Sequence, residues 1–243
     1  MIRIGTAGWT IPKPYALDFP AEGTHLHRYA QRLNAVEINS SFYRPHKPAT
    51  YARWAAGVPP DFRFAVKLPR EITHVRKLVG ITEPLDRFLS ETAALGDRLG
   101  PLLVQLPPSL TFDPGTAQTF FDMVRARCDG PVVCEPRHPS WFSDTAEAVL
   151  LRFQIARAAV DPAPVPQAAS PGGWLGMVYY RLHGAPRMYY SDYSANELDA
   201  TAAALGTGPA EPWCIFDNTA LGHATANALA LAGRIGPDRS DPA

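Results

Sequence analysis

The sequence has few cysteines, and they are not arranged to bind a metal. Only Cys128, Cys134 and Cys214 occur in 243 residues, and none lies in a CxxC pair or at Cys/His ligand spacing. Cys134 and Cys214 fall inside apolar runs that are typical of strands, so we expect buried thiols in a reducing compartment. The cysteines therefore give no support for a structural metal site.

Long apolar runs and an excess of charge are also missing. No stretch has the length of a membrane span and no signal-peptide core is present, so we expect a soluble, cytoplasmic protein without a membrane partner. The 23 basic and 23 acidic residues cancel to a net charge of zero. This total disfavours a strongly basic nucleic-acid module, although a local patch could still bind nucleic acid. The number of subunits is not indicated.

A glycine-rich phosphate turn is the last missing feature. GTAGW, residues 5–9, stands at the end of the first apolar run and does not match the GxGxxG pattern that a doubly wound dinucleotide-binding sheet would carry. What the chain does contain is a steady alternation of strand-like and amphipathic segments. The apolar runs are 2–8, 35–42, 62–69, 102–107, a run beginning at 132, 156–160, 177–184 and 213–218.

Helical patterns separate most of these runs. They cover 26–33, 48–54, 82–99, 114–124, 143–153, 194–205 and 223–233. After the sixth run the segment PAPVPQAASPGG cannot be helical because proline removes amide donors and blocks the preceding turn. The pattern predicts an α/β protein with a single TIM-like (β/α)₈ barrel domain over 1–236, an irregular Pro-rich loop in place of the sixth helix, and a frayed tail over 237–243. A doubly wound sheet is the alternative.

The predicted strands end in polar and ionisable residues. Side chains alternate between the two faces of a strand, so a phase that turns the apolar residues toward the helices turns the polar ones toward the barrel axis. Active sites of such barrels lie at the carboxyl ends of the strands. The residues predicted to face the axis there are Glu37, Asn39, Lys67, Gln105, Glu135, Arg137, Arg181, His183 and Asp217.

These residues suggest acid/base chemistry on an anion. The catalytic candidates are Glu37, Lys67, Glu135, His183 and Asp217, with Glu37 or Glu135 as base and His183 as acid. Arg137 and Arg181 would clamp a small phosphate- or carboxylate-bearing ligand, with the start of the last helix near 221–223 adding free amides. The alternative is that pairs such as Glu37–Lys67 and Glu135–Arg181 fill the axis without function.

We predict no metal and no cofactor, because histidines are scarce at the strand ends and Lys67, Arg137 and Arg181 would repel a cation. A metal-dependent phosphodiesterase or endonuclease-like hydrolase is the second hypothesis. Its ligands would be Glu37, Glu135, Asp161, His183 and Asp217.

Aromatic residues follow several predicted strands and could form a platform for a base or a sugar. They are Trp9, Phe42, Tyr43, Trp141, Tyr189, Tyr190 and Tyr193. The simpler explanation for each one is that it packs a loop onto the barrel. A third hypothesis follows from the group as a whole, namely a non-catalytic module that binds nucleic acid or a metabolite.

Several motifs together resemble one family along nearly the whole chain. GTAGW, VEINSSFYR, FAVKLP, QLPPS, CEPRHPSW, YYRLHG and FDNTALGHATANAL are similar to the domain-of-unknown-function 72, or YecE-like, family. The resemblance implies a TIM-like barrel without an established activity. It also implies that Trp9, Asn39, Tyr43, Gln105, His138, Trp141 and Asn218 are family-typical, and we add them with Tyr190 and Tyr193 as candidate ligand-binding residues. The chain departs from the family around 161–174, which is shorter and rich in Pro and Ala.

Overall fold

Parallel strands close around one axis in the computed structural model, which describes residues 1–206 and 210–236. One sheet has the strand order β1-β10-β9-β7 and the other β2-β3-β4-β5-β6-β8. A bridge between Ala7 and Glu37 joins β1 to β2 and closes one seam. The strands are β1 (Arg3–Thr6), β2 (Ala35–Ile38), β3 (Arg63–Lys67), β4 (Leu99–Gln105), β5 (Val132–Glu135), β6 (Ile155–Arg157), β7 (Ala159–Asp161), β8 (Gly172–Gly173), β9 (Val178–Leu182) and β10 (Pro212–Phe216).

The second seam lies in the predicted sixth strand, which bends at Ala158. β6 pairs with β5, the amide of Ala158 donates to Cys134 O at 2.9 Å, and β7 turns away to pair with β9. β6 and β7 therefore serve together as one bent strand of the barrel. The predicted TIM-like (β/α)₈ architecture is confirmed. β8 is a short addition that runs antiparallel to β6.

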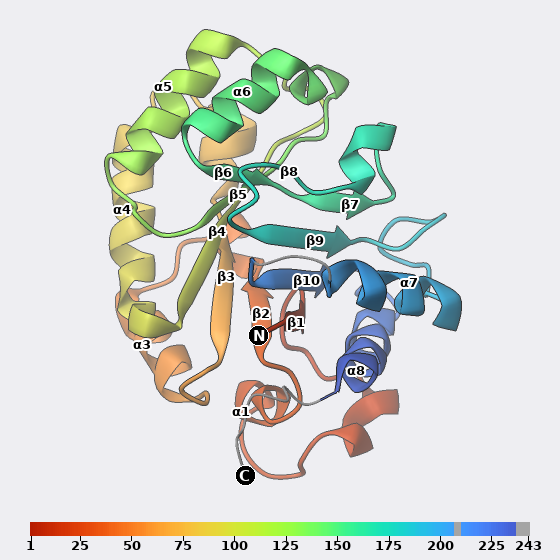
Figure 1. The fold of residues 1–243 in the computed structure, drawn as a ribbon. Helices are drawn as coiled ribbons and strands as arrows, with labels where there is room; N and C mark the ends of the chain where they lie inside the picture. The colour runs from red at the N-terminus through yellow and green to blue at the C-terminus, as the bar shows by residue number, and fades with distance from the viewer. Residues whose placement is uncertain (207–209, 237–243) are drawn as a thin grey trace.

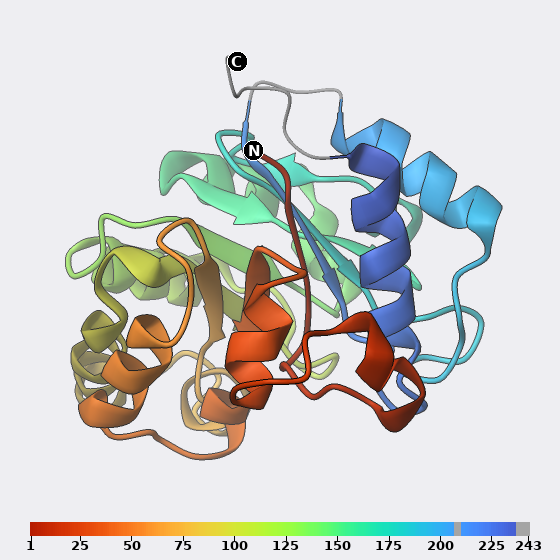
Figure 2. The same ribbon diagram turned by 90° about the horizontal axis from the view of Figure 1, so that it is seen from below.

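Helices surround the strands (Figure 1), with α3 to α6 on one side and α7 and α8 on the other. In Figure 2 the first segment of the chain runs between α1 and α8. The α-helices are α1 (His25–Ala30), α2 (Ser40–Tyr43), α3 (Pro48–Ala56), α4 (Thr82–Thr92), α5 (Pro114–Arg125), α6 (Asp144–Arg152), α7 (Ala195–Leu205) and α8 (His223–Ile235). Shorter turns are the 3-10 helices η1 (Lys13–Asp18), η3 (Ala93–Arg98), η4 (Pro139–Phe142) and η5 (Pro166–Ala169), and the π-helical η2 (Glu71–Val75).

Helix starts follow the capping residues that the sequence offers. Asp113 accepts from the Thr116 amide ahead of Pro114, and Ser143 accepts from the Ala146 amide. Ser194 and Glu197 form a complete capping box at α7. These local signals place three of the helix starts correctly.

Two predicted boundaries need correction. The helix predicted over 82–99 ends at Thr92, and a 3-10 turn follows in which Gly96 has φ 53°. Leu99, taken as a helix residue, begins β4 instead. The helix predicted over 26–33 is the shorter α1. The tail predicted at 237–243 lies outside the described residues.

An irregular loop replaces the sixth helix, as predicted, and Arg157 of β6 holds it. The Arg157 guanidinium donates to Gln167 O at 3.0 Å and to Ser170 O at 3.3 Å, and it pairs with Glu147 of α6. Gly173 has φ 62°, and a Cβ there would lie 2.4 Å from Ile155 O, so only glycine fits. The loop is therefore fixed to the barrel wall by side-chain and backbone contacts.

The core has two apolar zones separated by the barrel wall. The outward strand residues, among them Val66, Val104, Cys134, Leu182 and Phe216, pack against the helices. The inward residues form a layer across the axis that comprises Ala35, Ala65, Leu103, Val133, Ala156, Tyr179, Trp213 and Ile215. This arrangement confirms the predicted phase of the strands. Among the described residues, no helix has both the length and the apolar character to cross a membrane.

Candidate functional site

Arg181 of β9 lies at the centre of a buried charged cluster above the inward apolar layer. Its guanidinium donates to Glu37 of β2 through Nε at 2.8 Å and Nη2 at 2.6 Å, a two-pronged contact. Nη1 donates to Glu135 of β5 at 3.0 Å, and Nη2 lies 3.1 Å from Asp217 after β10. Tyr179 adds a bond to Glu37 at 3.1 Å. One cation thus links carboxylates from three other strands across the axis.

Arg137 and His183 complete the cluster. Arg137 lies 2.6 Å (Nε) from Glu135, and its Nη2 is 2.7 Å from His183 Nε2. Because a guanidinium can only donate, His183 Nε2 must accept, which places the imidazole proton on Nδ1. That atom lies 3.0 Å from Asp217 Oδ2 and donates to it. His183 is therefore oriented from both sides.

The charges in this cluster stabilise one another. Burial alone would raise the pKa of Glu135, but Arg181 and Arg137 hold that pKa well below its usual range. Burial likewise opposes ionisation of Asp217, yet Arg181 and His183 lower its pKa. Burial would lower the pKa of Arg181, but Glu37, Glu135 and Asp217 raise it. The cluster is an ionised network in which each charge has a partner.

Burial changes the roles that the sequence suggested for this network. Glu37, Glu135, Arg181 and His183 are 0% exposed, and Asp217 is 6% exposed. None of these five side chains lines the cavity above them. The predicted bases and acid therefore lie beneath the cavity, where Glu135 and His183 hold Arg137 in place.

A cavity of about 520 Å³ opens above the network, at the carboxyl ends of the strands. Its wall comes from segments that follow β2, β3, β4, β5, β7 and β9. The lining residues are Phe42, Tyr43, Lys67, Arg70, His74, Gln105, Leu106, Pro107, Pro108, Arg137, Pro164, Met188 and Tyr189. Three cations stand in this list, and no carboxylate does, among the residues that the structure describes.

The cationic side chains have donors to spare. Arg70 follows β3, is exposed, and forms no hydrogen bond or ion pair with any described residue. Arg137 uses Nε and Nη2 in the network, while its Nη1 has only the Met188 sulfur at 3.9 Å, a weak acceptor. Both guanidinium groups can therefore donate to a ligand without breaking a strong existing bond.

Lys67 ends β3 and points into the same cavity. Its Nζ lies 4.2 Å from the ring centre of Phe42, and within the described residues its ammonium has no hydrogen bond and no ion pair. The residue is 7% exposed. Burial, reinforced by the charge of Arg181, lowers the pKa of Lys67 to about 8. Near neutral pH a larger fraction of this amine is therefore neutral than is the case for an exposed lysine.

His74 and Tyr189 both line the cavity. Burial and the charges of Lys67 and Arg70 lower the pKa of His74, and its Nδ1 lies 2.8 Å from Thr73 Oγ1. Tyr189 has φ 70°, which is rare for an aromatic residue, and its amide donates to His183 O at 2.6 Å. Burial raises the pKa of the Tyr189 hydroxyl. The lowered pKa favours the neutral imidazole of His74, and the raised pKa favours the protonated hydroxyl of Tyr189.

Several predicted ligand-binding residues lie elsewhere or are already engaged. Trp141 is 1% exposed and donates to Leu110 O at 2.9 Å, so its ring cannot stack on a ligand in this structure. Tyr193 is 7% exposed and bonds Asp161 at 2.8 Å. Trp9 packs edge-on against Trp54 at 4.9 Å, outside the barrel.

The remaining predicted residues divide between structural roles and the cavity. The Asn218 amide bonds Ser191 O and Asn227, and His138 caps η4 through the Ser140 amide. Tyr190 stacks under Arg187 at 4.0 Å. Asn39 leaves its buried Oδ1 without a described partner, but it does not line the cavity. Tyr43, 78% exposed, and Gln105 do line it.

The predicted anion seat at the last helix does not form as expected. The Ala224 and Thr225 amides at the start of α8 donate to Asn218 O and Gly222 O. Arg181, the second half of the predicted clamp, is closed in by carboxylates. Arg70, for which the sequence patterns predicted no role, lines the cavity together with Arg137.

The alternative metal set is also rearranged. Asp161 bonds Tyr193, while Glu37, Glu135 and Asp217 gather around the Arg181 guanidinium, which occupies the centre of the three carboxylates. In the part of the chain that the structure describes, no group of three or more His, Cys, Asp or Glu side chains is placed to hold a metal ion.

The sequence patterns did not predict Arg70, His74 and Met188 as site residues, although all three line the cavity. The long segment after β3 was a usable signal, because loops of that length in a compact domain are often functional. Met188 gave no signal, since it lies in a turn without a recognisable pattern.

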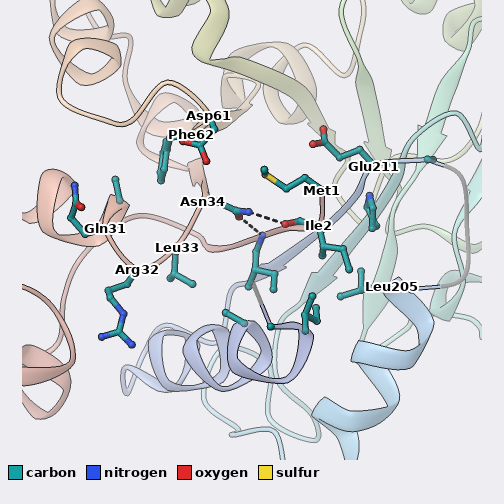
Figure 3. Close-up of a pocket in the computed structure, with 18 residues that line it drawn as sticks. Met1, Ile2, Gln31, Arg32, Leu33, Asn34, Asp61, Phe62, Leu205 and Glu211 are labelled. Carbon is teal, nitrogen blue, oxygen red and sulfur yellow. Dashed lines mark hydrogen bonds between the residues drawn. The ribbon is translucent and has the colours of Figure 1, made fainter. Parts of the chain in front are cut away.

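A larger cavity, about 720 Å³, lies at the opposite end of the strands (Figure 3). Asn34 holds its wall together, accepting from the Ile4 amide at 2.9 Å and donating to Ile2 O at 2.8 Å. In this architecture residues at the amino ends of the strands serve stability. The smaller cavity, above the charged network, is therefore the better candidate.

Comparisons with known proteins place these features in a family. A family model described as "Protein of unknown function DUF72" matches residues 3–242. UPF0759 protein YecE of Escherichia coli K12 is 32% identical over 179 residues, which cover 70% of this chain and 62% of YecE. UPF0759 protein YunF of Bacillus subtilis is 25% identical over 64% of this chain and 57% of YunF. The matches thus span less than two thirds of these curated relatives.

Solved structures agree with the fold. A DUF72 family protein from Enterococcus faecalis has a TM-score of 0.79 at 22% identity, covering 99% of this chain and 100% of that one. A DUF72 family protein from Thermotoga maritima gives 0.77 at 22% identity, with coverages of 97% and 99%. 3-Keto-D-glucoside 4-epimerase YcjR of E. coli gives 0.55 at 14% identity, with coverages of 96% and 98%. At these identities the likeness concerns the fold alone.

Proposed function

The chain belongs to the DUF72 family of proteins of unknown function, and we propose that its barrel binds a small anionic substrate and acts on it by acid/base chemistry. The observation that carries this proposal is the lining of the cavity above the network. Lys67, Arg70 and Arg137 face it, and no described carboxylate does. A ligand with a carboxylate or phosphate group fits such a wall.

The buried network supports binding of an anion, because its negative groups lie deeper in the barrel than the free cationic groups do. Its three carboxylates are bound to Arg181 below the cavity floor, whereas the free donors of Arg70 and Arg137 lie at the surface. With Lys67 protonated, four cationic side chains, Lys67, Arg70, Arg137 and Arg181, stand against the three carboxylates of Glu37, Glu135 and Asp217. The cavity therefore attracts anions although the whole chain has no net charge.

The rest of the wall is apolar or aromatic. Phe42, Leu106, Pro107, Met188 and Tyr189 surround the cationic groups. Pockets for small molecules commonly combine such a wall with a few polar groups that orient the ligand. The substrate we propose is thus a small organic anion with an apolar or planar part.

Lys67 is the group that exchanges the proton. Its pKa of about 8, caused by burial and by Arg181, lets it act as a base near neutral pH. His74 and Tyr189 are the partners that can accept or return protons on the same wall. The buried Glu135 and His183 keep Arg137 in place rather than touch the substrate.

We also propose that the protein works in the cytoplasm. All three cysteines are free thiols, and two of them are buried within strands. Fractionation of cells that produce the full-length protein tests this placement, and recovery with membranes or secreted proteins would contradict it.

Thermal unfolding tests the anion site. Inorganic phosphate or pyruvate in the millimolar range should raise the melting temperature of the wild type by about 2–6 °C, because a ligand that binds only the folded state stabilises it. Arg70→Ala should lose most of this rise. Arg53→Ala, which removes an exposed arginine of α3 that lies away from the cavity, is the matched control and should keep it.

Proton exchange tests the chemistry. In D₂O the wild type should speed the exchange of the methyl protons of pyruvate, followed by NMR, and Lys67→Met should not.

Equal melting shifts in Arg70→Ala and the wild type would place the anion elsewhere. Binding without any exchange, over a panel of small oxo acids, would leave a binding protein and contradict the enzymatic part.

A further inference from the structure

Lys67 differs from the other lysines of the chain. Lys13, Lys47 and Lys77 are exposed, whereas Lys67 is 7% exposed and sits at a strand end inside the barrel. An ammonium in such a place normally has a carboxylate partner, because burying an unpaired charge is costly. Here the nearby carboxylates are taken. Glu37, Glu135 and Asp217 are all ion-paired to Arg181.

We infer that Lys67 is a covalent nucleophile that forms an imine with a small carbonyl compound bearing a carboxylate or phosphate group. This inference rests on the proposed function, since Arg70 and Arg137 would hold the anionic group. The imine goes beyond the proposed function because it names the bond that forms and the class of substrate.

The geometry around Nζ leaves the amine without a hydrogen-bonding partner and open to the cavity. One side of Nζ faces the Phe42 ring at 4.2 Å, a contact that offsets only part of the cost of burying the ammonium, and Lys67 also lines the cavity. No described acceptor holds the nitrogen in a hydrogen bond, so its lone pair is available once the proton leaves. Lysines become nucleophiles in this kind of site, where a low-polarity wall and neighbouring cations disfavour the charged form.

The ionisation of Lys67 agrees with this geometry. Burial and Arg181 lower its pKa to about 8, compared with an ordinary value of 10.5. The neutral fraction near pH 7.5 is then larger than that of an exposed lysine by roughly two orders of magnitude. Exposed lysines of the same chain therefore serve as internal references for reactivity.

The reaction needs no oxidant and no further reactant. The neutral amine attacks the carbonyl carbon, the C=O electron pair moves to oxygen, and a proton passes from nitrogen to that oxygen. The carbinolamine then loses its hydroxyl group as water after a proton arrives, while the nitrogen lone pair forms the C=N bond. His74, whose pKa is lowered by burial and by the Lys67 and Arg70 charges, can accept the proton from nitrogen, and the Tyr189 hydroxyl can donate one to the leaving oxygen.

The placement of cations fits a bifunctional substrate. Arg70 belongs to the segment just after Lys67, while Arg137 reaches the cavity from the segment after β5. A ligand held between them presents its other end to Lys67. The volume of about 520 Å³ suits a small oxo acid or a phosphorylated aldehyde or ketone.

Reductive trapping tests the inference. The full chain is incubated at pH 7.5 with sodium cyanoborohydride and one of three probes, namely pyruvate, dihydroxyacetone phosphate or the uncharged acetone. Reduction converts an imine into a stable secondary amine, which peptide mapping by mass spectrometry locates. Lys67 should be labelled by pyruvate or by dihydroxyacetone phosphate at least about tenfold faster than Lys13, Lys47 and Lys77. The faster of the two probes tells a carboxylate substrate from a phosphate one.

Variants separate this inference from the proposed anion site. Lys67→Arg keeps a cation but removes the nucleophile, so it should show no adduct at 67 and keep the melting shift with phosphate. Arg70→Ala should slow labelling by the anionic probes and leave labelling by acetone unchanged.

If both anionic probes label Lys67 no faster than the exposed lysines, the imine is overturned. If Lys67 is not labelled but phosphate still gives an Arg70-dependent melting shift, the anion site stands without the imine. If the melting shift is absent as well, both the anion site and the imine are overturned. Labelling by acetone as fast as by pyruvate overturns the anionic substrate class.

Discussion

Arg181 is fully buried, and the carboxylates of Glu37, Glu135 and Asp217 share its guanidinium. Arg181→Ala would leave these three carboxylates in the interior without their common partner. We expect it to lower the free energy of unfolding by about 3–5 kcal/mol, because breaking a buried ion pair leaves uncompensated charge. Urea unfolding followed by circular dichroism measures this change.

Arg53→Ala on the outer surface of α3 is the control and should change the unfolding free energy by less than about 0.5 kcal/mol. A similar small effect of Arg181→Ala would mean that the network does not hold the barrel together. Strand alternation predicted the position of Arg181 on the axis correctly. The number of carboxylates around it could not be predicted, because they come from β2, from β5 and from the segment after β10.

Lys67 leads to a second prediction at the residue scale, this time of increased stability. Its folded-state pKa of about 8 lies below the value of 10.5 for the unfolded chain. Below pH 8 both states hold the proton, so the cost of burying the charge is fully present; that cost disappears as the pH rises from 8 to 10.5. Lys67→Met should therefore stabilise the protein at pH 7 by roughly 3 kcal/mol, a gain that shrinks toward pH 10.5.

Guanidinium unfolding of both proteins at pH 7 and pH 10 provides the measurement. Lys47→Met, at an exposed position, should leave stability unchanged at either pH. A gain for Lys67→Met that stays constant with pH would show that the methionine only packs better. A variant that is more stable and unable to exchange protons is the usual sign of a residue kept for function.

At the scale of single elements, the loop that replaces the sixth helix depends on Arg157. This side chain binds two carbonyls of the loop and Glu147 of α6. Arg157→Ala should release residues 162–173, so that hydrogen–deuterium exchange becomes faster there while the strands keep their protection. Because Pro164 of this loop lines the cavity, the response of the melting temperature to phosphate should weaken as well.

Arg152→Ala, which removes an exposed arginine at the end of α6, is the matched control and should leave exchange in 162–173 unchanged. Unchanged exchange in Arg157→Ala would mean that Gly173 and the β6–β8 pairing hold the loop without it. The prolines predicted the absence of a helix here. Nothing in them predicted where the loop would lie, because its anchor is a side chain of the neighbouring strand.

The end of α4 also depends on both local sequence and distant contacts: local sequence predicts that the helix forms, and pairing with another strand decides where the next strand begins. Leu85, Phe88 and Leu89 predicted a helix correctly, since they repeat with helical spacing. The prediction ran on to Leu99 because an apolar residue at the right interval looks the same in a helix or at a strand start. Gly96, with its positive φ, ends the helical path, and pairing with Phe64 of β3 makes Leu99 part of the sheet.

For the whole molecule, the barrel could be predicted because it follows from repeated local patterns, whereas the reachable part of the site could be predicted only in part. Lys67, Arg137, Tyr43 and Gln105 were candidate site residues from the sequence, and they line the cavity. Glu135, His183 and Asp217 have the residue types of catalysts, but packing closes them off. Arg70 has no distinctive neighbours in sequence, yet it stands free at the cavity. Depth from the surface decides these roles, and depth is a property of the assembled barrel. The net charge of the chain did not reveal the cationic cavity for the same reason. The carboxylates lie in the buried network, whereas free cationic groups line the cavity.

The position of Arg181 late in the chain bears on how the protein is made. A ribosome delivers Glu37 and Glu135 long before it reaches β9, and Asp217 comes last. Until Arg181 has emerged, the earlier strands cannot close over both carboxylates without enclosing unpaired charge. The nascent chain up to the end of β5 must therefore keep those side chains in water, and closure of the barrel waits for the final quarter of translation.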